Sequence, residues 1–310
     1  MNNPIKAAHE GWQSLPRTAR AMLLVLVGSF CGSAMGGLIR YVSADLHAFE
    51  IVFLRCLAAV LILTPTLFKY GLRVLHTKHI GMHVARGLIQ SFTMIAMFLA
   101  VTLSPLAKVT SMQFTSPLFA TVLAVLVLGE VIRVRRMVAL AIGFSGALIV
   151  LRPWVGDYDI GALLALAAAA VFSIVMILMR KLGKTESSIT QTIYMALLAT
   201  PLAFFAALTV WQTPTLVQLA WIALIGLLGT IANLFLAQAL REAELTAVLP
   251  MQFVKLIWAA LIGFIFFAEI PDIWTWMGGT VIFASATYIG LREHHLTRES
   301  RRWAADDANA

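Results

Sequence analysis

One apolar segment of membrane length occurs twice in this chain. Residues 112–130 read MQFTSPLFATVLAVLVLGE, and residues 251–269 read MQFVKLIWAALIGFIFFAE. Both segments begin with Met-Gln-Phe, have the same length and end on a glutamate. A membrane protein whose second half repeats its first is typical of carriers, in which the substrate site lies between two structural repeats.

The composition indicates that most of the surface faces lipid. Sixty per cent of the 310 residues are apolar and only 12% are charged, whereas a soluble domain has about 25% charged residues. A helix needs about 20 predominantly apolar residues to cross the hydrocarbon core. The chain contains ten such segments, at roughly 21–41, 48–68, 83–102, 106–129, 134–151, 159–180, 188–210, 217–239, 246–268 and 273–291. The predicted fold class is therefore all-α, a polytopic membrane protein with ten transmembrane helices.

The basic residues predict the orientation of these spans. If the N-terminus is cytoplasmic, most Lys and Arg residues, Arg86 among them, fall in cytoplasmic connections and tails, and the outer connections contain only Arg40, Lys108 and Arg152. This asymmetry follows the positive-inside rule and puts both termini in the cytoplasm. It also accounts for the net charge of +8 without a nucleic-acid partner.

Because each repeat holds five spans, an odd number, the two halves must lie in the membrane with opposite orientation. The predicted organisation is a cytoplasmic tail (1–20), a first five-helix repeat (21–152), a second five-helix repeat (153–292) and a second cytoplasmic tail (293–310). The polar tails are expected to be poorly ordered. Glu130 and Glu269 end their spans at opposite surfaces, and the simplest interpretation makes them hydrated boundary residues.

An ordered set of short motifs resembles a known family. The motifs are Leu54-Arg55-Cys56, Ser-Pro-Leu-Phe at 116–119, Gly129-Glu130, and Gly-Phe-Ser-Gly at 143–146 followed by Ala-Leu-Ile-Val-Leu-Arg-Pro. Together they resemble the EamA-type transporters of the drug/metabolite transporter superfamily, over residues 20–292. Segments 46–65, 83–90 and 184–202 look most like a bacterial inner-membrane branch that includes S-adenosylmethionine and riboflavin carriers.

The resemblance implies import or exchange of an S-adenosylmethionine-like, riboflavin-like or amino-acid-derived metabolite across the bacterial inner membrane. Export by the same superfamily is the alternative. The expected partners are this small molecule and membrane lipids, with the protein acting as a monomer or homodimer.

Two cations lie deep inside predicted spans. Arg55 is about eight residues from the outer end of its span and Lys255 about nine from the cytoplasmic end of its own, so each is roughly 12–14 Å deep at 1.5 Å per residue. A charge at this depth is a functional candidate by default. Both could neutralise a carboxylate or phosphate of the substrate. The alternatives are a structural contact of Arg55 with helix carbonyls or Glu50, and snorkelling of Lys255 along its stem.

Polar residues one helical turn apart form two stripes, one in each copy of the repeated segment. Gln113 and Ser116 share one face, as do Gln252 and Lys255, and these stripes line a cavity if both face inward. Hydrogen bonding between helices is the alternative. Trp258, a turn after Lys255, could stack on a planar substrate ring. Further candidates for the cavity wall are Gln90, Thr93, Gln191, Tyr194, Asn233 and Gln238.

Other function classes find less support in the sequence. No span contains HExxH, paired aspartates or a Ser/His/Asp set, which argues against a membrane-embedded lipid-modifying enzyme, and we predict no catalytic residue, metal site or cofactor. The chain has no filter-like loop for a channel and no GxxxxGK[ST] phosphate loop for a primary pump.

Cys31 and Cys56 lie in apolar runs and are expected to be free thiols. Because no acid lies in the middle of a span, exchange, facilitated flux or potential-driven movement is favoured over proton coupling.

Overall fold

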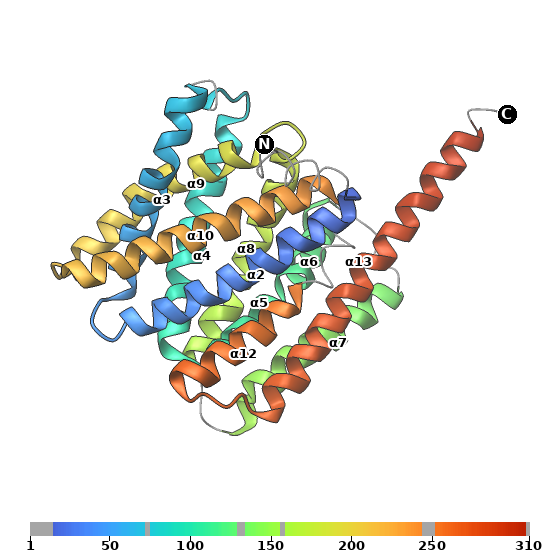
Figure 1. The fold of residues 1–310 in the computed structure, drawn as a ribbon. Coiled ribbons are helices and arrows are strands. Elements are labelled where there is room, and N and C mark those ends of the chain that lie inside the picture. Colours follow the sequence, from blue (N-terminus) through green and yellow to red (C-terminus); the bar gives the residue numbers. More distant parts are fainter. Residues whose placement is uncertain (1–14, 72–74, 129–133, 156–158, 244–251, 308–310) are drawn as a thin grey trace, which may run out of the picture.

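The computed structural model describes residues 15–71, 75–128, 134–155, 159–243 and 252–307, and within these ranges every regular element is a helix (Figure 1). The α-helices of the first half are α2 (Arg17–Val42), α3 (Ala48–Tyr70), α4 (Ile80–Leu103), α5 (Leu106–Gln113), α6 (Ser116–Leu128) and α7 (Val134–Leu151). A short 3-10 turn, η2 (Pro153–Val155), follows. The second half contains α8 (Ile160–Leu182), α9 (Ser188–Leu208), α10 (Leu216–Glu242), α12 (Val254–Phe267) and α13 (Ile273–Asp307).

Seven of the described helices are long and apolar enough to cross a membrane. The fourth predicted span is instead two shorter helices, α5 and α6, and the ninth is described from Gln252 onward, mostly as α12. The all-helical polytopic fold is therefore confirmed, whereas the count of ten spans stays a prediction.

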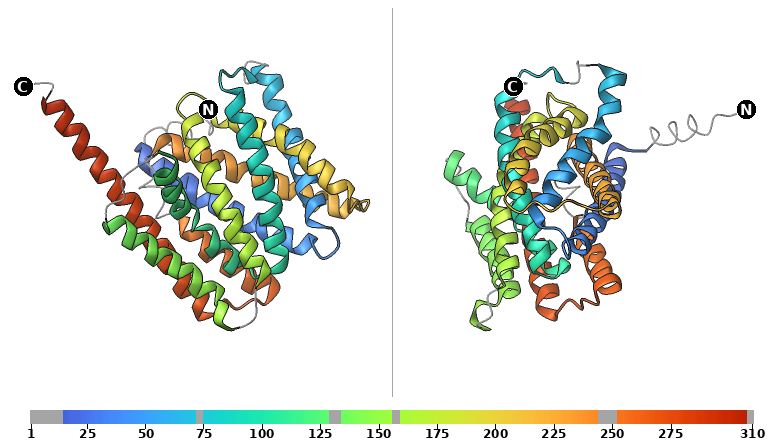
Figure 2. Two further views of the ribbon diagram at one scale, coloured as in Figure 1. Left: turned by 180° about the vertical axis from the view of Figure 1, so that it is seen from behind. Right: turned by 90° about the vertical axis from the view of Figure 1, so that its left-hand side faces the viewer.

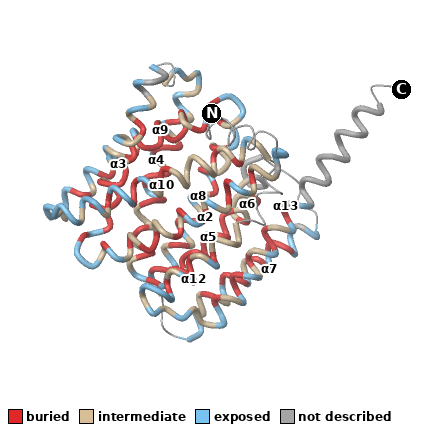
Figure 3. The backbone as a smooth tube through the Cα atoms, in the orientation of Figure 1, coloured by how far each residue is buried: buried red, intermediate tan, exposed pale blue. Residues whose placement is uncertain are grey.

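Large apolar side chains cover the outside of the bundle. Phe68 and Leu216 are 86% and 85% exposed, and Leu61, Phe205 and Phe266 are also exposed. Figure 3 shows the buried segments gathered where the helices face one another. Such a surface is unfavourable in water but matches lipid tails, as the composition predicts.

The helices of the two halves pack mainly against each other. The most extensive contacts pair α2 with α10, α7 with α13, α4 with α8, and α3 with α9, and α12 packs on α5 and α2. Small residues bring some pairs close together: a Cβ on Gly146 would lie 2.9 Å from the Gly278 carbonyl oxygen, and one on Gly278 2.5 Å from that of Gly146. The α7–α13 contact therefore requires glycine at both positions.

Three local expectations change once the structure is considered. The polar C-terminal tail is helical rather than poorly ordered as far as Asp307, because α13 continues beyond the bundle (Figures 1 and 2). Arg86, taken as a residue of a cytoplasmic connection, is inside α4, 2% exposed, and donates to the Gln191 carbonyl at 3.1 Å. Glu50 completes the capping box of α3 with His47 and accepts a hydrogen bond from the Gln212 amide.

Candidate functional site

A cavity of about 260 Å³ lies between the two halves of the bundle. Residues of α2, α3, α4, α5, α6, α8, α10 and α13 line it, together with Lys255 in the first turn of α12 and Gln252 just before that helix. The wall is mostly apolar and rich in flexible thioethers, namely Met35, Met94, Met97, Met176 and Met179. Methionine adapts its shape to irregular partners, so this wall suits an organic molecule with an apolar body.

The repeated segments both contain a helix break at their matching phenylalanines. The first break, at Phe114 and Thr115, separates α5 from α6, and the second, at Phe253, precedes α12. Pro117 explains the first one, because its ring would clash with the Gln113 carbonyl four residues earlier. The Ser116 hydroxyl instead donates to that carbonyl at 2.8 Å.

The two breaks meet beside the cavity. The Phe114 and Phe253 ring centroids are 6.0 Å apart, and the ring of Phe283 packs 4.6 Å from that of Phe253. Non-helical backbone is tolerated inside a membrane where it is buried in protein or lines a cavity. Broken helices that meet between two halves are the arrangement in which many carriers hold their substrates.

Lys255 joins the two predicted stripes. Its Nζ donates to Gln113 Oε1 at 2.5 Å, across the boundary between the halves, and Gln113 in turn donates to the Met97 sulfur at 3.1 Å. Both residues line the cavity. The ammonium group therefore points to the interior partner and does not snorkel towards an end of the bundle.

Arg55 is the most deeply buried cation of the cavity wall. It is 2% exposed, its Nη1 lies 3.1 Å from the Met94 sulfur, and its Nε has no hydrogen-bond partner among the residues that the structure describes. A thioether is only a weak acceptor. The suggested ion pair with Glu50 does not form, because that carboxylate caps α3 and accepts from the Gln212 amide. Gly229 leaves room for the guanidinium, since a Cβ there would lie 2.6 Å from Nη2.

Five further candidates from the sequence also line the cavity, namely Gln90, Thr93, Ser116, Asn233 and Gln252. Gln90 Oε1 is buried and has no hydrogen-bond partner in the described part of the chain, whereas Asn233 Nδ2 donates to the Gly229 carbonyl at 3.0 Å. The cavity thus collects amides, hydroxyls and two cations, and its described lining contains no Asp or Glu. Such a wall can bind a negatively charged or zwitterionic group.

The structure places four other candidates outside the cavity lining. The Tyr194 hydroxyl donates to the Leu75 carbonyl at 2.6 Å, and its ring stacks on His83. Trp258 packs edge-on against Phe30, with ring centroids 5.2 Å apart. Gln191 accepts from Arg86, and Gln238 accepts from the Ser188 hydroxyl at 3.0 Å. These residues hold helices together at their present positions.

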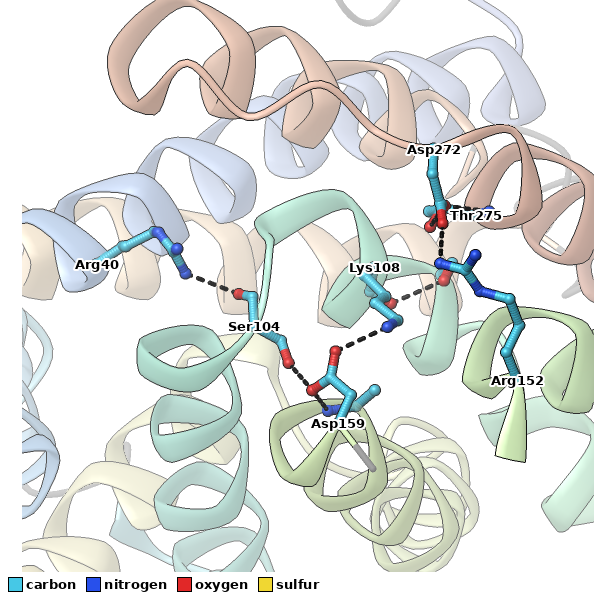
Figure 4. Close-up of polar contacts among 9 residues, drawn as sticks. Arg40, Ser104, Lys108, Arg152, Asp159, Asp272 and Thr275 are labelled. Carbon is cyan, nitrogen blue, oxygen red and sulfur yellow. Dashed lines mark hydrogen bonds and ion pairs between the residues drawn. The ribbon is translucent and has the colours of Figure 1, made fainter. Parts of the chain in front are cut away.

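Three ion pairs close the end of the bundle where the α12–α13 connection lies. Arg40 pairs with Glu269 at 2.6 Å, Lys108 with Asp159 at 2.8 Å, and Arg152 with Asp272. Figure 4 shows how Ser104 accepts from Arg40 through its carbonyl and bonds Asp159 through its hydroxyl. Each pair joins a cation of the first half to an acid of the second half.

Both aspartates of these pairs are held ionised by their neighbours. Burial alone raises the pKa of the Asp159 carboxyl, but hydrogen bonds from Lys108, Ser104 and the Ala162 amide outweigh it and keep this pKa below its ordinary value. Burial likewise raises the pKa of Asp272, and hydrogen bonds from Thr275 together with the charge of Arg152 bring it below the ordinary value. The pairs are therefore charged at neutral pH.

Glu269 also differs from the expected hydrated boundary residue. Its side chain is largely buried, pairs with Arg40 and accepts from the Leu106 amide at 2.9 Å. The chain reaches it through Ala268, whose left-handed backbone (φ 52°) ends α12. Its counterpart Glu130 lies outside the described residues.

The sequence profile of the EamA-like transporter family matches this chain twice, over residues 19–152 and 159–291. The chain belongs to the EamA-like transporter family. It is thus a multi-pass membrane protein of a transporter family, as the motif set at 54–56, 116–119 and 143–146 indicates.

Relatives within this family carry out metabolite transport. The chain is 31% identical over 267 residues to an S-adenosylmethionine uptake transporter of Rickettsia bellii, covering 86% of this chain and 91% of that protein. It is 32% identical over 248 residues to a riboflavin transporter of Vibrio cholerae, covering 79% and 82% of the two chains. One crystal structure, 16% identical, shares the fold with a TM-score of 0.62 and covers 90% of this chain and 99% of that one.

Several residues of this EamA protein's cavity, and the acids at its closed end, were not foreseen from sequence. The methionines of the cavity wall could not be predicted, because a methionine in an apolar span is indistinguishable in sequence from an ordinary core residue. The acids of the three ion pairs, Asp159 and Asp272 among them, lie in short connections, where the sequence does not show which cation each of them meets. The first helix break did have a signal, in Ser116-Pro117.

Proposed function

We propose that the protein is a secondary carrier that moves a small organic metabolite with an anionic or zwitterionic group across the bacterial inner membrane. The observation that carries the proposal is the pair of cations, Arg55 and Lys255, in a cavity between the halves whose described lining contains no acid. A buried cation without a counter-ion is costly, and a substrate carboxylate or phosphate supplies that counter-ion. The S-adenosylmethionine-like and amino-acid-derived candidates carry such a carboxylate, whereas a riboflavin-like candidate is neutral and would offer the two cations only carbonyl and hydroxyl oxygens.

We further propose that two inverted five-helix repeats form this carrier. In the predicted correspondence α2, α3, α4 and α7 match α8, α9, α10 and α13. Exchanging the halves turns the α2–α10 contact into α8–α4 and maps α3–α9 and α7–α13 onto themselves, and all these contacts are among the most extensive. The double match of the family profile supports the same division. Residues 21–152 and 153–292 are the proposed repeats.

The contrast between the two ends supports a mechanism of alternating access. The lining extends from Arg55 and Lys255 to Leu24, Met179 and Leu240, which lie towards the predicted cytoplasmic ends of α2, α8 and α10. The opposite end is closed by the three ion pairs. This arrangement supports a state in which the site communicates with the cytoplasm. Because Glu50 caps a helix and no described lining residue is acidic, exchange or potential-driven movement is favoured over proton coupling.

A counterflow experiment in proteoliposomes tests this function. Purified protein is reconstituted with unlabelled substrate inside, and uptake of radiolabelled S-adenosylmethionine, riboflavin and amino acids is measured. Lys255→Ala should lower uptake of the active compound at unchanged protein content, whereas Lys181→Ala, an exposed lysine outside the cavity, should not. Unchanged uptake by Lys255→Ala would remove this residue from the site.

Gly229→Ala separates a substrate role of Arg55 from a structural one. The added Cβ would displace the guanidinium without removing its charge. A raised KM with unchanged thermal stability indicates substrate contact, and a loss of stability with unchanged KM indicates a packing role. Arg55→Lys, which keeps the charge but loses the planar fork, should raise KM in the same direction.

A further inference from the structure

A second pocket, of about 550 Å³, lies at the end of the bundle opposite the three ion pairs. It is formed where α2 begins and where α8 and α10 end, so it joins the two halves. Five cations line it, namely Arg17, Arg20, Arg180, Lys184 and Arg241. The only acid of its described lining is Glu242.

That acid is already engaged. Glu242 pairs with Arg20 at 3.2 Å and accepts a hydrogen bond from Gln238 Nε2 at 2.6 Å. The other four cations have no ion pair among the described residues. The pocket therefore carries an excess positive charge that its own side chains do not balance.

We propose that this pocket binds the phosphate group of an anionic phospholipid. It lies at the start of the apolar span Ala19–Val42 and at the ends of the spans Ile160–Leu182 and Leu216–Glu242, which is the level of lipid headgroups. Three of its four unpaired cations are arginines, whose planar forks bind phosphate oxygens at two points. Basic pockets between helices on the cytoplasmic side are suited to anionic headgroups.

The pocket also touches the transport path. Leu240 lines both this pocket and the central cavity, and α2 and α10, which form two of its walls, make one of the most extensive contacts between the halves. A lipid phosphate held here would bridge the first half, through Arg17, to the second half, through Arg180 and Arg241. The site is independent of the transported compound.

Lipid binding to the full-length protein in micelles tests the proposal. Fluorescent phosphatidylglycerol is titrated against wild type, Arg180→Gln/Arg241→Gln, and the control Lys181→Gln, which changes an exposed cation next to Arg180 but outside the pocket. Each lost cation should weaken binding about fivefold and the pair about thirtyfold. The control should bind like wild type, and phosphatidylcholine should not compete.

Inorganic phosphate distinguishes the two sources of the anion. If millimolar phosphate displaces the lipid from wild type, and binds the double variant less well, the pocket holds a soluble phosphate-bearing molecule as readily as a lipid. If only anionic lipid competes, the headgroup is the ligand. Equal lipid affinity of wild type and the double variant, or equal competition by phosphatidylcholine, would overturn the site. Thermal stability of each variant, measured alongside, shows that a loss of binding is not a loss of folding.

Discussion

The charged side chains at the two ends of the bundle are arranged in opposite ways. At one end Arg40, Lys108 and Arg152 each meet an acid of the other half. At the other end five cations surround a single acid, Glu242, and the central cavity extends towards them. The predicted positive-inside orientation would account for the larger number of cations at the second end, but it does not account for the pairing at the first. The difference suggests that one end is sealed by contacts within the protein and the other is left for external anions.

Fixing the sealed end should have the largest effect. We expect a double variant Arg40→Cys/Glu269→Cys, bridged by a bifunctional thiol reagent, to lose counterflow almost completely, because alternating access requires this end to open. The background replaces Cys31 and Cys56, both free and buried, by Ala. Each single cysteine variant treated with the same reagent serves as the control. Normal counterflow by the bridged protein would show that this end does not open during transport.

Breaking one pair of the sealed end should destabilise the protein. Arg40→Ala removes the ion pair with Glu269 and two hydrogen bonds, to the carbonyls of Val101 and Ser104. Leaving buried acceptors unsatisfied costs about 1–3 kcal/mol each, before compensation by water. A lower denaturation midpoint in micelles, relative to wild type, is the measurement. A variant as stable as wild type would show that the seal adds nothing to folding.

The sealed end should also loosen in acid. The folded pKa values of Asp159 and Asp272 lie below their ordinary value, which is about 3.9. Their stabilisation is therefore complete above that value and is lost as pH falls through the lower folded pKa. The protection of backbone amides around residues 104–108 and 269–275, measured relative to their intrinsic exchange rate at each pH, should fall below about pH 4. Asp159→Asn should exchange faster near Ser104 already at neutral pH, and an identical exchange profile would contradict the assignment.

The smallest effect belongs to the unpaired end. Arg180→Gln changes an exposed cation without an ion pair among the described residues, so the free energy of unfolding in pure detergent should change by no more than about 0.5 kcal/mol. The same substitution should matter only when anionic lipid is present. A large loss of stability in lipid-free micelles would mean that Arg180 has a structural partner.

Much of this architecture follows from sequence because hydrocarbon imposes strict rules. Spans must be long and apolar, and backbone groups must be paired within helices, so helix positions such as 48–70 and 188–208 are readable from the chain. The repeated Met-Gln-Phe motif likewise marks the two helix breaks. The meeting of Gln113 with Lys255 follows from the repeat and from their shared faces.

Other features depend on three-dimensional packing that no local pattern encodes. The environment of Arg55 is set by Gly229 and Met94 on two other helices. Trp258 shares a helical face with Lys255, yet it packs against Phe30, and Tyr194 bonds the Leu75 carbonyl instead of reaching the cavity. Acids such as Asp272 lie in connections between helices, and the packing of the two halves determines which cation each acid contacts.

The sign of the ion pairs has a consequence for the ancestry and assembly of such a chain. In all four pairs of the described residues the cation comes from the first half and the acid from the second. Two copies of one half would not reproduce this set of complementary charges, although Glu130, which matches Glu269 in the repeat, would supply an acid at one of the four positions. We therefore expect fragments split near residue 155 to associate with each other more strongly than with copies of themselves.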